Sequence, residues 1–215
     1  MKNIFVFMLL GFVLIAGCSR TGTNSKQENA IATENVAAND VSKQSFITVT
    51  NNDGKQIVRI LFNGNDVEIE YSGNKFVGAL KGDKRKYTDK SGTMVAEFKF
   101  SEPTKLKLRT PEGQLLWKIK IDTDKIKVSN NEENLNPYQI KMGYPDKVKV
   151  LDASEQELGD ARFDAVSGKM EITGSEGVMF VKSDKLSAAY GVLLMSSIPD
   201  RDKYIILAEL LAKNL

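Results

Sequence analysis

The sequence contains no histidine, and its 215 residues include one cysteine, Cys18. Histidine is the commonest general base at neutral pH and the commonest ligand of transition metals, so catalysis by Ser-His-Asp or Cys-His groups is excluded. One cysteine leaves zinc, haem and iron–sulfur centres almost without conventional ligands, and it cannot form a disulfide within the chain. We therefore expect neither a cofactor nor a metal site, and the sequence singles out no catalytic residue.

The chain also lacks a strong charge of one sign and a long hydrophobic run. Its 30 lysines and arginines nearly balance its 28 aspartates and glutamates, which argues against nucleic acid as a partner. An uncharged run over residues 4–16 is shorter than the roughly 20 apolar residues that cross a bilayer as a helix. With Lys2 before it and small residues after it, this run has the features of a secretory signal.

The four residues Ile15-Ala16-Gly17-Cys18 close this run, directly after Leu14. They resemble the lipobox of bacterial lipoproteins. The resemblance implies that diacylglycerol is attached to the Cys18 thiol and that the signal peptide 1–17 is cut off between Gly17 and Cys18. It also implies that the new amino group is acylated, for example with palmitate. Two alternatives stay open: an ordinary signal peptide followed by a chance cysteine, and an uncleaved N-terminal anchor.

Residues 18–44 differ in composition from the rest of the chain. They are rich in serine, threonine, asparagine and alanine and contain no aromatic residue. Such a segment cannot bury enough apolar surface to fold alone. We expect it to be a lipidated, flexible tether that precedes a single domain over residues 45–215.

From Phe46 onward, apolar and polar residues alternate, which is the pattern of strands with one buried face. Turn sequences such as Asn52-Asp53-Gly54 and Ser72-Gly73 separate the alternating segments. Many short strands with closely spaced turns predict a mainly β fold. We expect an antiparallel barrel of about twelve strands, with a sandwich as the alternative.

The pattern becomes helical near the C-terminus. We expect one helix over residues 185–198, because residues 186–198 carry no charge and are apolar on nearly every side of a helix. A helix of this kind must be buried inside the fold. A second helix is expected over residues 200–213, beginning after Pro199. Its apolar residues fall on one face, which predicts that it packs on the outside of the barrel or closes one end.

Residues 184–195 read DKLSAAYGVLLM, and residues 115–119 read LLWKI after Glu112-Gly113. A strand-rich body followed by such an uncharged helix resembles the tubby-like superfamily, which includes phospholipid scramblases and LURP-one-related proteins. The resemblance implies a closed barrel of about twelve strands around one hydrophobic helix, and contact with phospholipids or phosphoinositides. It does not extend to functional residues. No matching pair of inositide-binding basic residues is found, and the palmitoylated cysteine cluster of scramblases is absent.

Lysines occupy the outward positions of several predicted strands. If these strands are neighbours, one side of the barrel is basic and would contact a partner or anionic lipid headgroups, at about 1 kcal/mol per basic residue. The alternative is that these lysines solvate the sheet and discourage edge-to-edge aggregation. The set comprises Lys105, Lys107, Lys118, Lys120, Lys125, Lys127, Lys147 and Lys149.

Other candidate sites have simpler interpretations. The segment Asn130–Asn134 is rich in oxygen ligands but lacks the spacing of an EF-hand loop, so we interpret it as a solvated loop. We expect Trp117 and Tyr190 in the core. No two acids are set apart as the catalytic pair that a carboxylate hydrolase would need.

The leading interpretation is a non-enzymatic lipoprotein of the bacterial cell envelope, whose domain binds or supports an envelope protein, a lipid or a glycan. The second is a lipid-handling protein whose barrel engages acyl chains or headgroups, and the third is a histidine-free hydrolase. The expected location is the outer membrane, at its periplasmic or surface face, in a Gram-negative bacterium. In a Gram-positive bacterium it is the outer face of the cytoplasmic membrane. A barrel filled by its own helix would favour the first interpretation over the second.

Overall fold

The structure, a computed structural model, describes residues 45–215. The predictions about Cys18, the signal peptide and the tether lie outside these residues. Fourteen strands and two helical segments follow one another in the described part of the chain. The strands are β1 (Ser45–Asn51), β2 (Gln56–Asn63), β3 (Asp66–Tyr71), β4 (Asn74–Lys81), β5 (Lys84–Asp89), β6 (Met94–Glu102), β7 (Lys105–Arg109), β8 (Leu115–Ile121), β9 (Lys125–Ser129), β10 (Tyr138–Lys141), β11 (Lys147–Leu151), β12 (Glu157–Asp164), β13 (Lys169–Gly174) and β14 (Gly177–Lys182). The helical segments are a 3₁₀ helix, η1 (Ala188–Leu194), and an α-helix, α1 (Asp200–Ala212).

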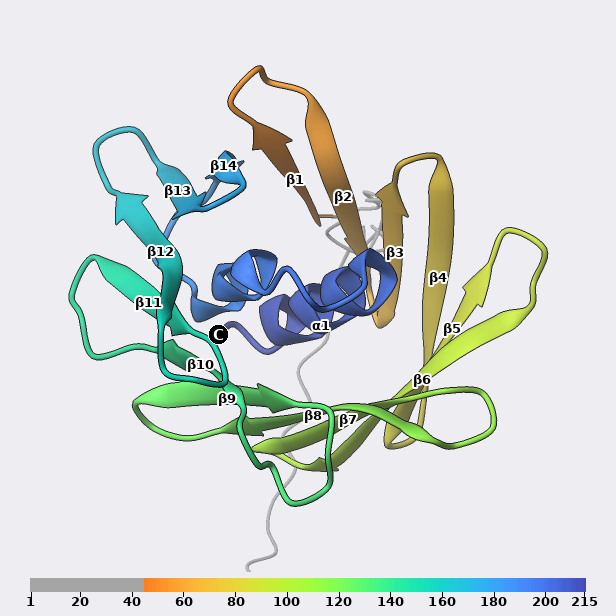
Figure 1. The fold of residues 1–215 in the computed structure, drawn as a ribbon. Coiled ribbons are helices and arrows are strands. Elements are labelled where there is room, and N and C mark those ends of the chain that lie inside the picture. Colours follow the sequence, from red (N-terminus) through yellow and green to blue (C-terminus); the bar gives the residue numbers. More distant parts are fainter. Residues whose placement is uncertain (1–44) are drawn as a thin grey trace, which may run out of the picture. The chain divides into compact units, whose positions relative to one another are not determined.

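The strands form one closed antiparallel barrel in which each strand pairs with the next along the chain (Figure 1). Pairing of β1 with β14 closes the ring. The predicted mainly β, closed barrel is therefore confirmed, and the alternative of a sandwich is wrong. The described residues contain fourteen strands rather than about twelve.

The alternating sequence sets which side chains face the interior. In β7, Leu106 and Leu108 are fully buried, whereas the three basic residues of the strand are only partly buried. Successive side chains of a strand point to opposite faces of the sheet, so one period-two pattern supplies both the core and the polar outer wall. The turn of Ser72 and Gly73 needs positive φ at both positions, 46° and 77°, as two-residue hairpin turns do.

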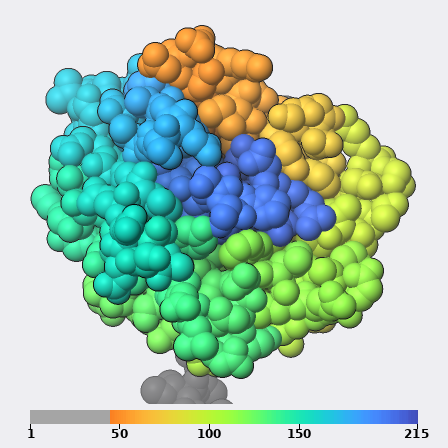
Figure 2. Space-filling model, in the orientation of Figure 1, coloured from red at the N-terminus to blue at the C-terminus, as the bar shows by residue number. Residues whose placement is uncertain are grey.

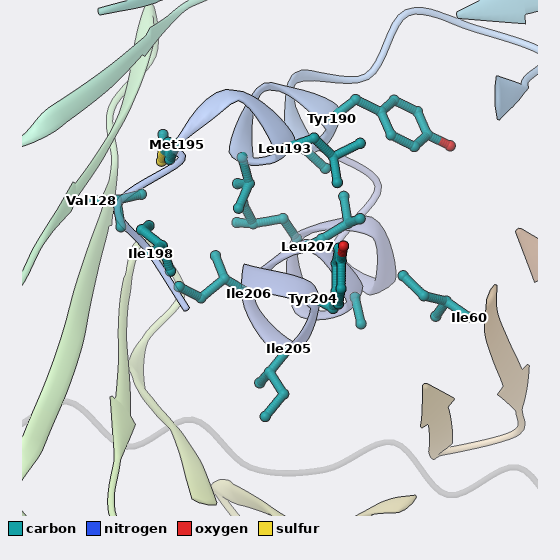
Figure 3. Packing of buried hydrophobic residues seen from close by; sticks show 14 of the residues in the cluster. Ile60, Val128, Tyr190, Leu193, Met195, Ile198, Tyr204, Ile205, Ile206 and Leu207 are labelled. Atoms are coloured by element: carbon teal, nitrogen blue, oxygen red, sulfur yellow. The ribbon is translucent and has the colours of Figure 1, made fainter. Parts of the chain in front are cut away.

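Both helical segments lie inside the barrel, where they fill the centre of the ring of strands (Figures 1 and 2). Apolar side chains of both segments contribute to the core, among them Leu193, Met195, Ile206 and Leu207 (Figure 3). Every residue of η1 is buried, as the uncharged sequence predicts. This segment forms a 3₁₀ helix over 188–194, however, instead of a helix over 185–198.

The prediction that the second helix packs on the outside or closes one end is wrong. All residues from Asp202 to Leu210 in α1 are buried, including three that carry charge. These charged side chains pair with other residues of the barrel and of α1 itself. They therefore do not need to be solvated by water. Within residues 45–215, α1 and η1 together thus occupy the centre of the barrel. None of the helices in residues 45–215 is long and apolar enough to span a membrane.

Candidate functional site

The barrel has two different ends, which we call proximal and distal. The proximal end is the one at which β1 begins with Ser45, and because neighbouring strands run in opposite directions, every odd-numbered strand begins there. The chain also ends there: the Lys213 ammonium, just after α1, donates to the carbonyl of Pro103 in the turn between β6 and β7. The distal end carries the start of α1, where the indole of Trp117 meets Asp202. Possible binding surfaces can be located relative to these two ends.

The eight lysines predicted as a surface lie on β7, β8, β9 and β11. The register places Lys105 opposite Lys120 and Lys107 opposite Lys118, and Lys120 also lies opposite Lys127 on its other side. Like charges directly opposite each other destabilise a sheet. The wall of the barrel therefore does bring most of these lysines together, although β10 separates β9 from β11.

Acidic side chains neutralise much of this lysine surface. The shortest ion pairs join Lys107 to Glu132 at 2.7 Å and Lys149 to Glu157 at 2.8 Å. The hydrogen bond from Lys107 lowers the pKa of the Glu132 carboxyl, which keeps it ionised. Lys118 donates to the backbone carbonyl of Glu132. The remaining five lysines each lie within 4.0 Å of an acid; these pairs are Lys105–Glu102, Lys120–Asp122, Lys125–Asp124, Lys127–Asp122 and Lys147–Asp160.

A second group of lysines, which the sequence did not single out, lies at the proximal end close to the seam between β1 and β14. We call Lys169, Lys182 and Lys185 the proximal lysines; all three are exposed, and Lys169 lies directly opposite Lys182. The ion pairs of residues 45–215 include none of them. Their positive charges face solvent and are therefore less neutralised by acids than those of the predicted lysine surface.

A pocket of about 640 Å³ opens beside the proximal lysines. It exists because β1 pairs with β14 only through Val49, Thr50 and Asn51, so the first part of β1 has no partner on that side. Its lining includes Ile47 of β1 and Leu211 near the end of α1, and Lys182 and Lys185 stand at its rim. Burial raises the pKa of Tyr190, another lining residue, to about 12, so its phenol stays neutral.

A buried ionic cluster joins α1 to the wall of the barrel. The Arg85 guanidinium lies 2.9 Å from the Glu209 carboxylate, and the Tyr87 hydroxyl donates to the same oxygen at 2.7 Å. Arg85 also donates to the carbonyl of Asn65. The side chains of Arg85 and Glu209 are 7% and 1% exposed, and within residues 45–215 neither Arg85 Nε nor the second Glu209 oxygen makes a hydrogen bond. Burial raises the pKa of Glu209, whereas Arg85 opposes that shift.

A second polar contact holds the other end of the same helix. The Trp117 indole donates to Asp202 at 3.1 Å, and Arg201 lies 2.8 Å from the other Asp202 oxygen. Asp202 and Glu209 are about two helical turns apart, so the two contacts fix both the position and the rotation of α1 in the barrel. Neither acid lines the proximal pocket. We interpret both as structural, because no substrate could reach their carboxylates.

Gly78 provides the space for the ionic cluster. It lies opposite Tyr87, and a Cβ atom at this position would be 2.6 Å from the Tyr87 ring and 2.7 Å from the Arg85 side chain. We expect Gly78→Ala to lower the free energy of unfolding by about 1–3 kcal/mol, as overpacking does. Urea unfolding checks this, with Val77→Ala on the outer face of the same strand as the control. Equal stability of Gly78→Ala and wild type would show that the cluster has room to move.

The sequence alone did not single out the residues of this cluster or the proximal lysines. Among residues 45–215, no group of acids is arranged to hold a metal ion. No family model matches the chain, and no curated protein matches it either. One solved structure, described as an X-ray structure of a protein from Arabidopsis thaliana, is similar over 65% of this chain and 91% of its own, with 11% identity and a TM-score of 0.36. This likeness is too remote to bear on function.

Proposed function

We propose that the protein is a lipid-anchored component of the bacterial cell envelope, and that its barrel acts through its surface rather than through a reactive side chain. The observation that carries this proposal is the filled interior: η1 and α1 occupy the barrel, and their side chains form its core. A barrel whose interior is filled by its own side chains is rigid, and it leaves its outer surface, not its centre, to bind a partner. The lipobox-like residues before Cys18 supply the anchor.

The order of the chain sets where the tether joins the barrel. The predicted tether reaches the barrel at Ser45, which lies at the proximal end. The proximal end is therefore the point at which the proposed anchor and tether join the barrel, and the distal end is the end farther along the barrel from that attachment. The proposal places the protein at the outer membrane of a Gram-negative bacterium or at the outer face of the cytoplasmic membrane of a Gram-positive one. An antiparallel barrel around a C-terminal helix also supports assigning the fold to the tubby-like superfamily.

Extraction of membranes tests the anchor. Acyl chains hold a protein through apolar burial, which salt does not screen, whereas charged contacts at a surface weaken at high ionic strength. We expect the protein to sediment with membranes, to resist extraction by 1 M salt, and to be released by detergent. Release by salt alone would contradict the lipid anchor and would leave only a charge contact.

A second function, engagement of lipid by the barrel itself, is favoured by the proximal pocket. Its lining combines apolar side chains with Lys182, Lys185 and Asp184, and the pocket lies at the end where the proposed tether joins the barrel. A negative leaflet attracts each nearby basic residue by about 1 kcal/mol. This alternative therefore assigns headgroup contact to the proximal lysines and acyl contact to the pocket.

Charge reversal at the two ends tests this second function. In residues 19–215 without lipid, Lys182→Glu/Lys185→Glu should weaken binding to vesicles containing phosphatidylglycerol by about tenfold or more. The control, Lys55→Glu/Lys90→Glu, makes the same change in net charge at the distal end, where both lysines are exposed. We expect it to bind within about twofold of wild type. Equal losses in both variants, or no binding by wild type, would rule out a lipid-binding proximal end.

A further inference from the structure

A smaller pocket, of about 300 Å³, lies at the distal end. Two aromatic residues, Trp117 and Tyr138, line it together with carboxamide and hydroxyl side chains. None of its lining residues carries a formal charge, although 27% of the residues in the chain are charged. Its volume is at the lower limit of small-molecule sites. The lining consists of Trp117, Val128, Ser129, Asn130, Asn131, Leu135, Asn136, Tyr138, Ala153 and Ser197.

Contacts from inside the barrel hold the two aromatic rings in place. The Trp117 indole is tied by its hydrogen bond to Asp202, and the Tyr138 hydroxyl is hydrogen-bonded to Ser197. Both aromatic side chains are only half buried, so parts of their surfaces remain open to the pocket. An aromatic residue of this kind offers a large apolar surface at little cost in conformational entropy. The rings are therefore fixed surfaces on which an apolar face of a ligand can rest.

The third wall is the loop between β9 and β10, which is pinned from outside. Lys107 and Arg109 hold the Glu132 carboxylate at 2.7 and 2.9 Å. The Asn131 side chain donates to the carbonyl of Leu135 and accepts from its amide. The Glu132 side chain thus points to the wall of the barrel, and the residues of the loop that line the pocket are all neutral.

Two carboxamides of this loop are free to bind a ligand. Within residues 45–215 the Asn136 side chain makes no hydrogen bond, and Asn130 only accepts one, at 3.5 Å. Asn136 has a φ of 47°, in the left-handed region that asparagine tolerates better than most residues. A carboxamide offers both donors and an acceptor, which suits a ligand whose groups also do both.

We propose that the distal pocket binds a neutral saccharide. A sugar ring has an apolar C–H face, which would lie on Trp117 or Tyr138, and a rim of hydroxyl groups, which would bond to Asn130 and Asn136. An ionic ligand would find no opposite charge in the lining. The pocket lies at the end opposite Ser45, where the tether from the proposed anchor joins the barrel. Saccharide binding itself does not depend on that anchor.

The single tryptophan of the chain makes the test direct, because its fluorescence reports on this pocket alone. Residues 19–215 are titrated with chitotriose, a neutral trimer of N-acetylglucosamine, and with maltotriose. We expect at least one of them to cause a saturable change in emission. Asn130→Ala/Asn136→Gly should weaken that binding by about tenfold, as loss of hydrogen bonds to an uncharged ligand does. Glycine at 136 avoids backbone strain.

The control is Asn74→Ala, at the first residue of β4, which lies at the same end but outside the pocket. It should bind as wild type does, and circular dichroism should show all three proteins folded. No saturable change with either trisaccharide at millimolar concentration would overturn the proposal. Unchanged affinity in the folded double variant would also overturn it.

Discussion

Glu209→Ala is expected to destabilise the barrel by about 3–5 kcal/mol, because it leaves the Arg85 guanidinium buried without its partner. Arg85 is 7% exposed and cannot lose its charge at any pH at which the protein folds. The loss should appear as a lower midpoint of urea unfolding, followed by the fluorescence of Trp117. Arg85→Met/Glu209→Met should recover most of it, because apolar side chains of similar size replace both charges. About 1 kcal/mol should stay lost, because the Tyr87 hydroxyl then has no acceptor.

Arg85→Met alone and Glu209→Ala alone should differ in how their cost in stability depends on pH. Burial raises the pKa of Glu209, so the folded protein takes up this proton at a higher pH than the unfolded chain does. Between the two pKa values, stability therefore rises as the pH falls. Removing Arg85 takes away the group that opposes the shift most strongly and widens this window. The cost of Arg85→Met should thus be smaller at about pH 5 than at about pH 7, whereas the cost of Glu209→Ala should not shrink.

An exposed ion pair provides the matched control. Arg162 and Asp146 lie 3.0 Å apart, and both side chains are 50% exposed. Asp146→Ala should cost less than about 1 kcal/mol, as surface pairs do. If Glu209→Ala costs no more than Asp146→Ala, the central position of α1 does not depend on the ionic cluster.

Cys18→Ser is expected to abolish membrane attachment or to stall processing, because serine lacks the thiolate that accepts diacylglycerol. Two or three acyl chains hold a protein stably on a bilayer, and a single chain does so only marginally. Cell fractionation should therefore find wild type with membranes, and the variant either in the soluble fraction or retained as a larger precursor.

Ser19→Ala is the matched control for this variant, since it changes the adjacent residue but leaves the thiol. It should be processed and should stay with the membranes like wild type. A Cys18→Ser variant that is cut to the same size and remains bound to membranes would contradict the lipid anchor. An ordinary signal peptide or an uncleaved anchor would then be the better interpretation of residues 1–17.

The barrel could be predicted from the sequence because its pattern is local. Residues such as Leu106 and Leu108 alternate with lysines, and that period alone identifies a strand with one buried face. The burial of η1 was predictable for a similar reason, since its segment carries no charge. Its 3₁₀ geometry was not, because hydrophobicity does not distinguish two helices with similar periods.

The central position of α1 could not be predicted, because the partners of its charges are distant in the sequence. Glu209 depends on Tyr87, which is 122 residues away, and Asp202 depends on Trp117, which is 85 residues away. A pattern that counts charges on one helix assigns such residues to solvent. The proximal lysines were missed because only closure of β1 on β14 brings them beside the start of the barrel. The distal pocket could not be predicted either, because it combines residues of several strands with the loop between β9 and β10. The Glu132 side chain of that loop is held by Lys107 and Arg109 of β7.

The proposed lipid anchor depends most on what is attached to Cys18, and mass spectrometry of the mature protein purified from membranes tests this directly. We predict an N-terminal peptide that begins at Cys18 and carries diacylglycerol on its sulfur. A mature chain that begins elsewhere, or a peptide in which the Cys18 thiol is free, would contradict the proposed anchor.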